Sequence, residues 1–341
     1  MLLGHDKVNF LGGATPLTRL DRLSEALGID LWLKRDDMTP FGTGGNKLRK
    51  LEYLLKDAQD QGATMLLTTG GAQTNHGRLT AAVAAKYGMR CAIVAVDEYP
   101  GEISANLLLD GIMDCHVYLV KQDGVHTSGE LAKAAFADVT AEWEAKGEKV
   151  YFIPVGGSNE IGALGYYDCA LELAAQAKEL GIEEPRIVTT VGSMGTYIGL
   201  LSAQLNEGLP FGLTGVTIMP YENVAESALS YYGRVKDFYG LSYEATEDDL
   251  SIVTDFDCGA YNNPVKEVRD AIRCMGSSEG ILLDPCYTGK TFAAILGMVK
   301  DGRIRQGESV IMLHTGGIPG LYTKHHRIEF EKELMDHIHI I

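Results

Sequence analysis

Short apolar runs alternate with helix-like segments along most of this 341-residue chain, and this alternation constrains its fold more than any other feature. Runs such as 65–69, 91–96 and 116–120 are bounded by turn residues, and the segments between them carry helical spacing. Strands that alternate with helices of ten or more residues form parallel βαβ units. We therefore predict an α/β protein with mostly parallel open sheets. Further strands are expected at 150–154, 186–191, 213–219, 252–254 and 309–314, and helices at 20–27, from 47 onward, and at 79–87, 104–113, 129–146 and 162–180.

The length of the chain favours two lobes that share one cleft. We predict a smaller α/β lobe at residues 50–157. The larger lobe is then made from the two remaining segments, 1–49 and 158–341. The sequence contains no long linker and no low-complexity tract, so the lobes are expected to pack against each other.

Charge and cysteine content exclude several classes of protein. The net charge is -16, and no run of five basic residues offsets it, which argues against a nucleic-acid or membrane partner. No apolar run reaches the length of a membrane span. Six scattered cysteines without a CxxC pair or a secretory signal indicate a reduced, cytoplasmic protein. The nine histidines show no metal-ligand spacing, so we expect no metal; the alternation at 337–341 is typical of an edge strand or a frayed tail.

Four predicted strand ends carry glycine-rich or polar turns. In open α/β sheets ligands bind at the carboxyl ends of strands, where glycine lets the backbone approach them. One such turn would be weak evidence, whereas four together are hard to explain by folding alone. The turns are Thr74-Asn75-His76, Gly156-Gly157-Ser158-Asn159, Ser193-Met194-Gly195-Thr196 and His314-Thr315-Gly316-Gly317.

Lys47 follows a glycine-rich stretch and is expected to open a helix with Asn46 as its N-cap. A cation at a helix N-terminus is mildly unfavourable. One interpretation is an ordinary surface lysine. The other is an amine whose pKa is lowered by the helix end and by partial burial, so that it can form a Schiff base.

The turn Gly192–Thr196 lies between a predicted strand and a predicted helix, where N–H groups converge as in a phosphate cradle. It lacks the lysine of a Walker loop and the spacing of a dinucleotide site. A tight turn with only a structural role explains it equally well.

Four motifs, in this order along the chain, resemble one family. They are Gly44-Gly45-Asn46-Lys47-Leu48-Arg49-Lys50, Gln73-Thr74-Asn75-His76-Gly77-Arg78, Asp284-Pro285-Cys286-Tyr287-Thr288-Gly289-Lys290 and His314-Thr315-Gly316-Gly317. The chain is similar to pyridoxal-phosphate enzymes of the tryptophan-synthase β type (fold type II), in the branch of D-cysteine desulfhydrase and 1-aminocyclopropane-1-carboxylate deaminase. The resemblance covers nearly the whole chain and implies two three-layer lobes.

The resemblance also implies roles for site residues. Lys47 would form the Schiff base with pyridoxal 5'-phosphate and later move the Cα proton. Asn75 would face the phenolate oxygen of the cofactor. The hydroxyl of Thr315 would pair with the ring nitrogen, leaving it unprotonated and favouring expulsion of a β-leaving group. Its phosphate would be held by Ser193, Met194, Gly195 and Thr196.

Two positions distinguish activities within this branch. Ring-opening deaminases are expected to carry Tyr-Glu where this chain has Tyr287-Thr288, so the missing carboxylate favours β-elimination. Thr74 stands where the family usually has Ser, and its extra methyl puts the substrate in doubt more than the reaction. Tyr261 and Tyr287 are both candidates to flank the substrate as an acid, a base or a group that orients the thiolate. His76 is either a carboxylate binder or a helix-start residue.

We expect a carbon–sulfur lyase that acts on a small amino acid, with D-cysteine converted to pyruvate, ammonia and hydrogen sulfide. The expected catalytic residues are Lys47, Thr74, Tyr261 and Tyr287, and the expected substrate-binding residues are Thr74, Asn75, His76, Tyr287 and Thr288. Alternatives are an L-cysteate sulfo-lyase, the cyclopropane deaminase or, from another class, a non-catalytic ligand-binding or nucleotide-binding protein on this fold. The resemblance also implies a homodimer.

Overall fold

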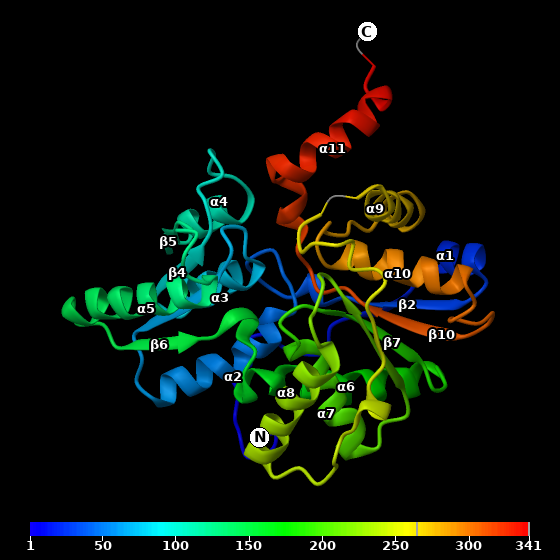
Figure 1. Ribbon diagram of the computed structural model, residues 1–341. Helices are drawn as coiled ribbons and strands as arrows, with labels where there is room; N and C mark the ends of the chain where they lie inside the picture. Colours follow the sequence, from blue (N-terminus) through cyan, green and yellow to red (C-terminus); the bar gives the residue numbers. More distant parts are fainter. Residues whose placement is uncertain (264, 340–341) are drawn as a thin grey trace.

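Two separate β-sheets, one of six strands and one of four, organise the computed structural model, which describes residues 1–263 and 265–339 (Figure 1). Almost all neighbouring strands are parallel, and helices connect them. The predicted α/β class with mostly parallel open sheets is therefore confirmed.

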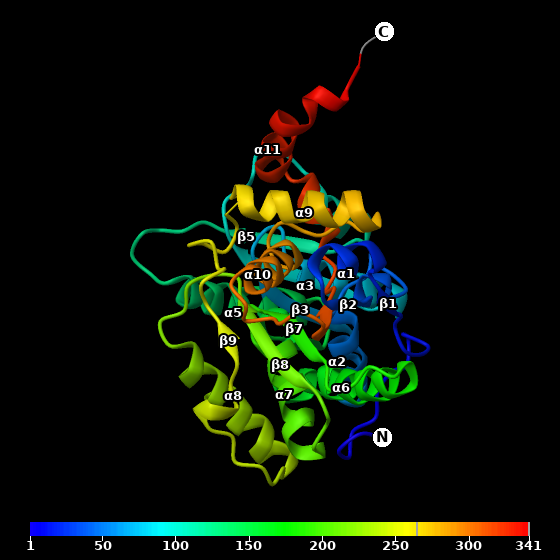
Figure 2. The ribbon, with the colours of Figure 1, turned by 90° about the vertical axis from the view of Figure 1, so that its right-hand side faces the viewer.

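The six-stranded sheet has the order β1-β2-β10-β7-β8-β9, and only the edge strand β1 runs antiparallel to its neighbour. Alternate residues of β10 enter different cores. Ile311 and Leu313 pack with the helices α6, α7 and α8, whereas Val310 and Met312 pack with α1, α9 and α10. Helices therefore cover both faces, as Figure 2 shows from the side. The strands are β1 (Leu17–Arg19), β2 (Asp30–Lys34), β7 (Arg186–Val191), β8 (Gly212–Thr217), β9 (Ile252–Val253) and β10 (Ser309–Leu313); the helices are α1 (Asp21–Leu27), α6 (Glu160–Leu180), α7 (Gly195–Glu207), α8 (Val224–Tyr239), α9 (Lys266–Glu279), α10 (Thr288–Lys300) and α11 (Lys324–Leu334).

The four-stranded sheet has the order β5-β4-β3-β6 and is parallel throughout. Its central strand β3 places Leu66 against α2 and α3, and Met65 and Leu67 against α5. Both faces are again covered, which explains why β3 and β4 are almost uniformly apolar. The elements are α2 (Lys47–Asp60), β3 (Met65–Gly70), α3 (Asn75–Lys86), β4 (Arg90–Val96), α4 (Ala105–Ile112), β5 (His116–Val120), α5 (Ser128–Ala145) and β6 (Val150–Ile153).

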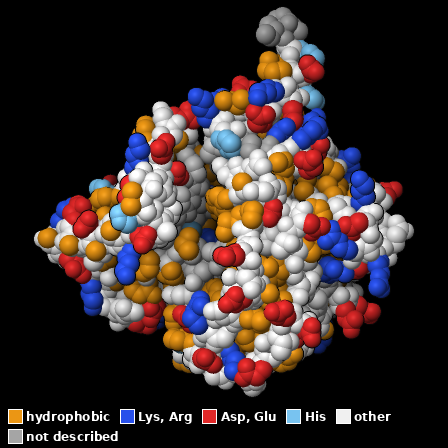
Figure 3. Space-filling model, viewed as in Figure 1, with side chains coloured by type: hydrophobic (Ala, Val, Ile, Leu, Met, Phe, Trp, Pro, Cys, Tyr) orange, Lys and Arg blue, Asp and Glu red, His pale blue; other side chains and the backbone are white. Residues whose placement is uncertain are grey.

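All strands of the smaller sheet lie within 50–157, and all strands of the larger sheet lie outside that range. Helix α2 begins at Lys47, three residues before the proposed boundary. The division into 1–49 plus 158–341 and 50–157 stays a prediction that this sheet membership supports. In Figure 3 the surface is hollowed between the part over the smaller sheet and the rest of the molecule.

One helix boundary needs correction. Helix α3 begins at Asn75 and not near residue 79, because the hydroxyl of Thr74 accepts a hydrogen bond from the N–H of Gly77 (3.2 Å) and starts the helix earlier. At the other end of the chain, Met335–His337 form a short 3-10 turn after α11, which leads away from the body in both ribbon views. Of the predicted alternation at 337–341, Ile340 and Ile341 lie outside the described residues.

A buried ion network joins helices of the two sheets. Arg49 on α2 is 2% exposed and donates to Asp36 (2.9 Å) and to Glu172 on α6 (2.8 Å). Burial alone would raise the pKa of Asp36, but the charge and hydrogen bonds of Arg49 hold this pKa below 3.8. Lys34 also contacts Glu172. The network ties α2 to α6 and to the segment after β2.

The six cysteines are free. Among the described residues, no helix combines the length and the apolar character needed to span a bilayer.

Candidate active site

A cavity of about 510 Å³ opens at the carboxyl ends of strands from both sheets. Residues that end or follow β3, β7, β8 and β10 line it, together with the start of α2. The structure therefore gathers segments that are far apart in the sequence. Ten of the predicted site residues line the cavity: Lys47, Thr74, Asn75, His76, Ser193, Met194, Thr196, Tyr261, Tyr287 and Thr315. Gly195 and Thr288 do not line it.

Lys47 is the first residue of α2, and its Nζ donates to Oδ1 of Asn46 (3.1 Å). Burial, followed by the charge of Arg78, lowers the pKa of Lys47 to about 8. Near neutral pH this amine is therefore neutral and nucleophilic far more often than an ordinary lysine amine. This low pKa and the position in the cavity favour the reactive-amine interpretation over that of a surface lysine.

The glycines before Lys47 allow two chain segments to approach closely. Gly44 has φ +70, and a Cβ there would lie 1.9 Å from the carbonyl oxygen of Asp37. The N–H of Asn46 donates to the carbonyl of Thr315 (3.0 Å), which places the end of β10 beside the start of α2. Any side chain larger than hydrogen at Gly44 would open this junction.

Asn46 has a role that the sequence did not suggest. It occupies the N-cap position, but its side chain makes no capping hydrogen bond. Its amide instead accepts from Lys47 and donates to Oγ1 of Thr196 (3.0 Å). Asn46 thus links the amine to the turn before α7.

The turn between β7 and α7 has the features of an anion site. Met194 has φ +62, and α7 begins at Gly195 without a side-chain cap. The N–H of Gly195 donates to the carbonyl of Ser193 (2.8 Å), and the N–H groups that follow it in the first turn have no side-chain partner among the described residues. Oγ of Ser193 accepts from Oγ of Ser158 (2.8 Å). A Cβ at Gly195 would lie 2.5 Å from Oγ of Ser158 and 2.6 Å from Nζ of Lys50. This cradle fits a phosphate group.

Lys50 supplies a cation beside this cradle, and sequence reasoning missed it. It lies one helical turn after Lys47, is 1% exposed, and donates to the carbonyl of Gly156 (3.0 Å) and to Ser158 (3.3 Å). Burial and the nearby Lys47 lower its pKa well below 10.5. A bound anion would restore the charged form. The signal available in the sequence was the i, i+3 spacing from Lys47.

Asn75 is held by its neighbours in one orientation. Its Oδ1 accepts from Nη1 of Arg78 and from Nδ2 of Asn106, both at 3.0 Å. Its own NH₂ group makes no hydrogen bond to the described residues and lies close to Gly317. An acceptor in the cavity, such as a phenolate oxygen, could therefore use this donor.

His76 is neutral and has a defined tautomer. The single hydroxyl proton of Thr68 goes to the carbonyl of Ile153 (2.8 Å), so Thr68 must accept from Nε2–H of His76 (2.9 Å). Nδ1 is left buried without a hydrogen-bond partner among the described residues. Burial and the two neighbouring lysines lower the pKa of His76 well below 6.5. A substrate carboxylate would find better donors in the first N–H groups of α3 than in this ring.

The methyl group of Thr74 fits because two nearby residues are glycine. A Cβ at Gly77 would lie 2.4 Å from Cγ2 of Thr74, and a Cβ at Gly70 would lie 2.5 Å from its Oγ1. The hydroxyl of Thr74 caps α3, at the edge of the cavity. Thr74 therefore keeps the hydroxyl that a Ser would have, and its methyl group adds contacts on the side of Gly77.

Tyr261 and Tyr287 meet over the cavity. Their hydroxyls are hydrogen-bonded to each other, and their rings are perpendicular with centroids 5.8 Å apart. Burial raises the pKa of Tyr287 well above 10 and also raises the pKa of Tyr261, although 45% of the surface of Tyr261 is exposed. Both are therefore proton donors at neutral pH. Pro264, in the same loop, is outside the described residues.

Thr288 holds the loop of Tyr287 instead of facing the cavity. Its hydroxyl donates to Asp284 (2.7 Å) and accepts from the N–H of Asp284 (2.8 Å). Asp284 also accepts from the N–H groups of Tyr287 (2.9 Å) and Cys286 (2.9 Å). None of the described residues that line the cavity is Asp or Glu.

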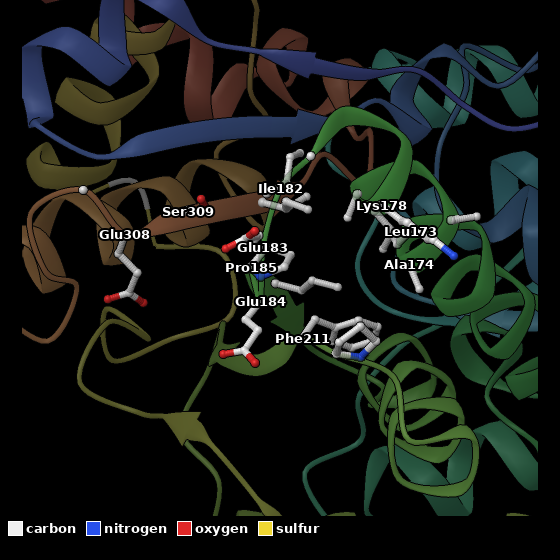
Figure 4. A pocket seen from close by; sticks show the side chains of 17 residues that line it. Leu173, Ala174, Lys178, Ile182, Glu183, Glu184, Pro185, Phe211, Glu308 and Ser309 are labelled. Carbon is white, nitrogen blue, oxygen red and sulfur yellow. The ribbon is translucent and has the colours of Figure 1, made fainter.

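A second, wider hollow of about 1290 Å³ lies at the opposite ends of the parallel strands (Figure 4). It is lined by the end of α6, by the segment 182–185 before β7, and by the starts of β8 and β10. Of the described residues predicted as site residues, none lines it. The cavity at the carboxyl ends is therefore the candidate active site.

The chain is similar to several known proteins over nearly its whole length. Residues 8–316 match the family described as "Pyridoxal-phosphate dependent enzyme". The chain is 40% identical over 330 residues to D-cysteine desulfhydrase of Yersinia enterocolitica, covering 94% of this chain and 97% of that protein. It is 37% identical over 317 residues, 93% of both chains, to a Pyrococcus abyssi protein whose name assigns it provisionally to 1-aminocyclopropane-1-carboxylate deaminase. A crystal structure of an "ACC deaminase homologue" matches 99% of this chain and 98% of its own, with a TM-score of 0.85 and 32% identity.

Proposed function

Because this chain belongs to the pyridoxal-phosphate-dependent enzymes, we propose that it is a carbon–sulfur lyase that converts D-cysteine to pyruvate, ammonia and hydrogen sulfide. The observation that carries the proposal is the pairing, in one cavity, of the Lys47 amine of lowered pKa with the hydrogen-bonded hydroxyls of Tyr261 and Tyr287. An amine base and a proton donor are the two groups that β-elimination of a thiol requires.

The residues present fit the cofactor. The phosphate would lie against Ser193, Met194, Gly195 and Thr196, with Lys50 as the nearby cation. The NH₂ group of Asn75 would face the phenolate oxygen, and Thr315 at the end of β10 would face the ring nitrogen. When bound, pyridoxal phosphate supplies an electron sink that makes the substrate Cα proton acidic.

The protein groups then perform three tasks. The N–H groups at the start of α3 and the hydroxyl of Thr74 would hold the substrate carboxylate. The amine of Lys47 would take the Cα proton. As the Cβ–S bond breaks, its electron pair leaves with sulfur, and Tyr287, supported by Tyr261, would protonate the departing thiolate. The unsaturated amine that remains takes up one water and yields pyruvate and ammonia.

The cavity favours elimination over opening of a cyclopropane ring. Position 288 is Thr, its hydroxyl is occupied by Asp284, and no carboxylate is found among the described residues lining the cavity. The names of two similar proteins keep the deaminase as a second candidate, and L-cysteate remains an alternative substrate.

A substrate panel tests the proposal. Purified holoenzyme is incubated with D-cysteine, L-cysteine, L-cysteate, D-serine and 1-aminocyclopropane-1-carboxylate, and 2-oxoacid and sulfide are quantified. We expect equal amounts of pyruvate and sulfide from D-cysteine. Formation of 2-oxobutyrate from the cyclopropane substrate, with no sulfide from either cysteine, would support the deaminase instead. A colourless protein without turnover would support a non-catalytic role.

Lys47→Ala is the matching variant, with Lys56→Ala, on the exposed side of the same helix, as its control. We expect Lys47→Ala to lose the covalent attachment of the cofactor that borohydride traps, and to lose turnover, whereas Lys56→Ala keeps both. Full turnover in Lys47→Ala would contradict the assignment.

We also propose that the enzyme is a cytoplasmic homodimer. The family resemblance supports the dimer, and the six free cysteines are compatible with a reducing compartment. Light scattering after size-exclusion chromatography would measure the mass of the assembly.

A further inference from the structure

Arg78 lies behind the cavity and has no role in the function proposed above. It is 0% exposed and comes from the first turn of α3. Its guanidinium donates to three neutral oxygens: Oδ1 of Asn75 (3.0 Å), Oδ1 of Asn106 (2.9 Å) and the carbonyl of Gly44 (3.0 Å). It therefore touches both the residue that faces the cavity and the glycine turn that leads to Lys47.

The charge of Arg78 is not neutralised by an ion pair among the described residues, and its Nε makes no hydrogen bond there. Asp110 on α4 is the carboxyl group whose charge acts most directly on it. Both oxygens of Asp110 are buried without hydrogen-bond partners among the described residues. Burial raises the pKa of Asp110 to about 7, and Arg78 only partly opposes this. Asp110 is therefore protonated much of the time near pH 7, and above pH 7 its carboxylate offsets part of the Arg78 charge.

Three basic groups surround Lys47. His76 is neutral, and burial together with the charge of Lys47 lowers the pKa of Lys50 well below 10.5. Arg78 is the charged group that acts on the Lys47 amine. Its charge disfavours a second positive charge at Lys47.

We infer that Arg78 is a positioning residue for the reaction: its guanidinium turns the NH₂ group of Asn75 toward the cavity, and its positive charge, which no ion pair among the described residues neutralises, makes protonation of the Lys47 amine less favourable. The inference rests on the proposed function because it takes Lys47 as the reacting amine. If Arg78 had only a structural role, its hydrogen bonds would matter but its positive charge would not.

The experiment separates the effect of the Arg78 charge from the effect of its hydrogen bonds. In the full chain freed of cofactor, Lys47 is acylated by an amine-specific reagent across a pH series, and peptide mass spectrometry gives the midpoint of its titration relative to exposed lysines. The pH midpoint of the visible absorbance of the reconstituted holoenzyme is a second readout. Arg78→Gln removes the charge, and Arg78→Lys keeps it. Arg90→Gln is the control, since Arg90 is an exposed arginine of the same sheet.

We expect Arg78→Gln to raise both midpoints by about 1 pH unit, the effect of losing one nearby charge. Arg78→Lys should keep the parental midpoint but bind the cofactor more weakly, since it cannot make all three hydrogen bonds. Asp110→Asn should lower the midpoint, because the carboxylate that opposes Arg78 above pH 7 is gone. Arg90→Gln should change nothing.

A folded Arg78→Gln variant with the parental midpoints, or an equal shift in Arg90→Gln, would overturn the inference. If Arg78→Gln does not fold, Asp110→Asn becomes the deciding variant. An unchanged midpoint of the Lys47 titration in that variant would overturn the inference. The acylation readout needs no substrate, so the two failures can be told apart: a shift in a protein that fails the substrate panel would refute the proposed function but still show that Arg78 acts on the Lys47 amine.

Discussion

At the scale of single residues, side chains of the same type have different roles in the site because their surroundings differ. Lys47 and Lys50 are one helical turn apart on α2, yet one faces the cavity and the other is bound to Gly156 and Ser158 beside the anion cradle. Asn46 was expected to cap the helix and instead connects Lys47 to Thr196. Residue type and spacing identify such positions as candidates, whereas the role of each residue becomes clear only from its contacts in the folded protein.

Lys50→Met tests the cation beside the cradle. We expect cofactor affinity, measured by fluorescence titration, to fall by about 10- to 100-fold, because a hydrogen bond to a charged group is lost. The cofactor-free variant should be as stable as the parent or more stable, because Met carries no charge into the core. Equal cofactor affinity in the two proteins would contradict the assignment.

The same variant makes a prediction about pH. The pKa of Lys50 in the fold lies well below 10.5, so unfolding takes up a proton between the two values. The contribution of Lys50 to the free energy of unfolding therefore rises with pH through this window. Urea denaturation of the cofactor-free chains at several pH values should show a weaker pH dependence for Lys50→Met.

Tyr287→Phe tests the proton donor. We expect turnover of D-cysteine to fall by about 100-fold, because the thiolate leaves without a proton. Turnover of β-chloro-D-alanine should change little, since chloride leaves as an anion. Equal losses on both substrates would show that Tyr287 shapes the cavity and does not donate a proton.

At the scale of elements, the glycine turn before α2 decides where the reactive amine lies. A Cβ at Gly44 would collide with the carbonyl of Asp37, and the next residues contact the end of β10. The early start of α3 at Asn75 has a comparable effect, since it brings the first N–H groups of that helix to the cavity. Both features concern the few residues that join regular elements.

Gly44→Ala should destabilise the protein far more than Gly62→Ala. Both glycines have φ +70, so both variants incur the same backbone strain of about 1 kcal/mol. At Gly62 the nearest atom to a new Cβ, Nζ of Lys149, is 3.8 Å away, so the difference between the two isolates the clash with Asp37. Chemical denaturation and cofactor titration of both variants would measure it, and equal losses would contradict the prediction.

Much of the fold and part of the site could be predicted from the sequence. The parallel α/β class followed from hydrophobic runs such as β3 and β4, because sheets covered on both faces leave that signature. Lys47 and the turn before α7 stood out by their glycines. Two details could not be predicted because each depends on the folded arrangement of the chain. Lys50 is bound to Gly156, and the hydroxyl of Thr288 is bound to Asp284 and does not face the cavity. The tautomer of His76 likewise depends on Thr68.

At the scale of the whole molecule, the ion network around Arg49 connects the helices of the two sheets. It brings together residues from α2, α6 and the segment after β2. Because its members are mostly buried, each depends on the others for charge compensation. The shape of the cleft between the sheets should therefore depend on this network.

Arg49→Met should lower the free energy of unfolding by about 3–5 kcal/mol, since it leaves Asp36 buried without its partner. Arg186→Met, which breaks the more exposed pair with Glu308, should cost about 1 kcal/mol or less. The parental protein should also lose stability in acid as the pH falls below 3.8 through the lowered pKa of Asp36. Denaturation curves of equal stability for the two variants would contradict this.

The contact between Asn46 and Thr315 has a consequence for synthesis in the cell. The reactive amine is translated more than 250 residues before the strand end that borders it on the other side, since they are Lys47 and Thr315. A nascent chain on the ribosome cannot close the cleft around Lys47 until Thr315 has emerged. Acquisition of the cofactor should therefore follow emergence of β10 and Thr315, and its visible colour would appear only after these two distant segments have come together.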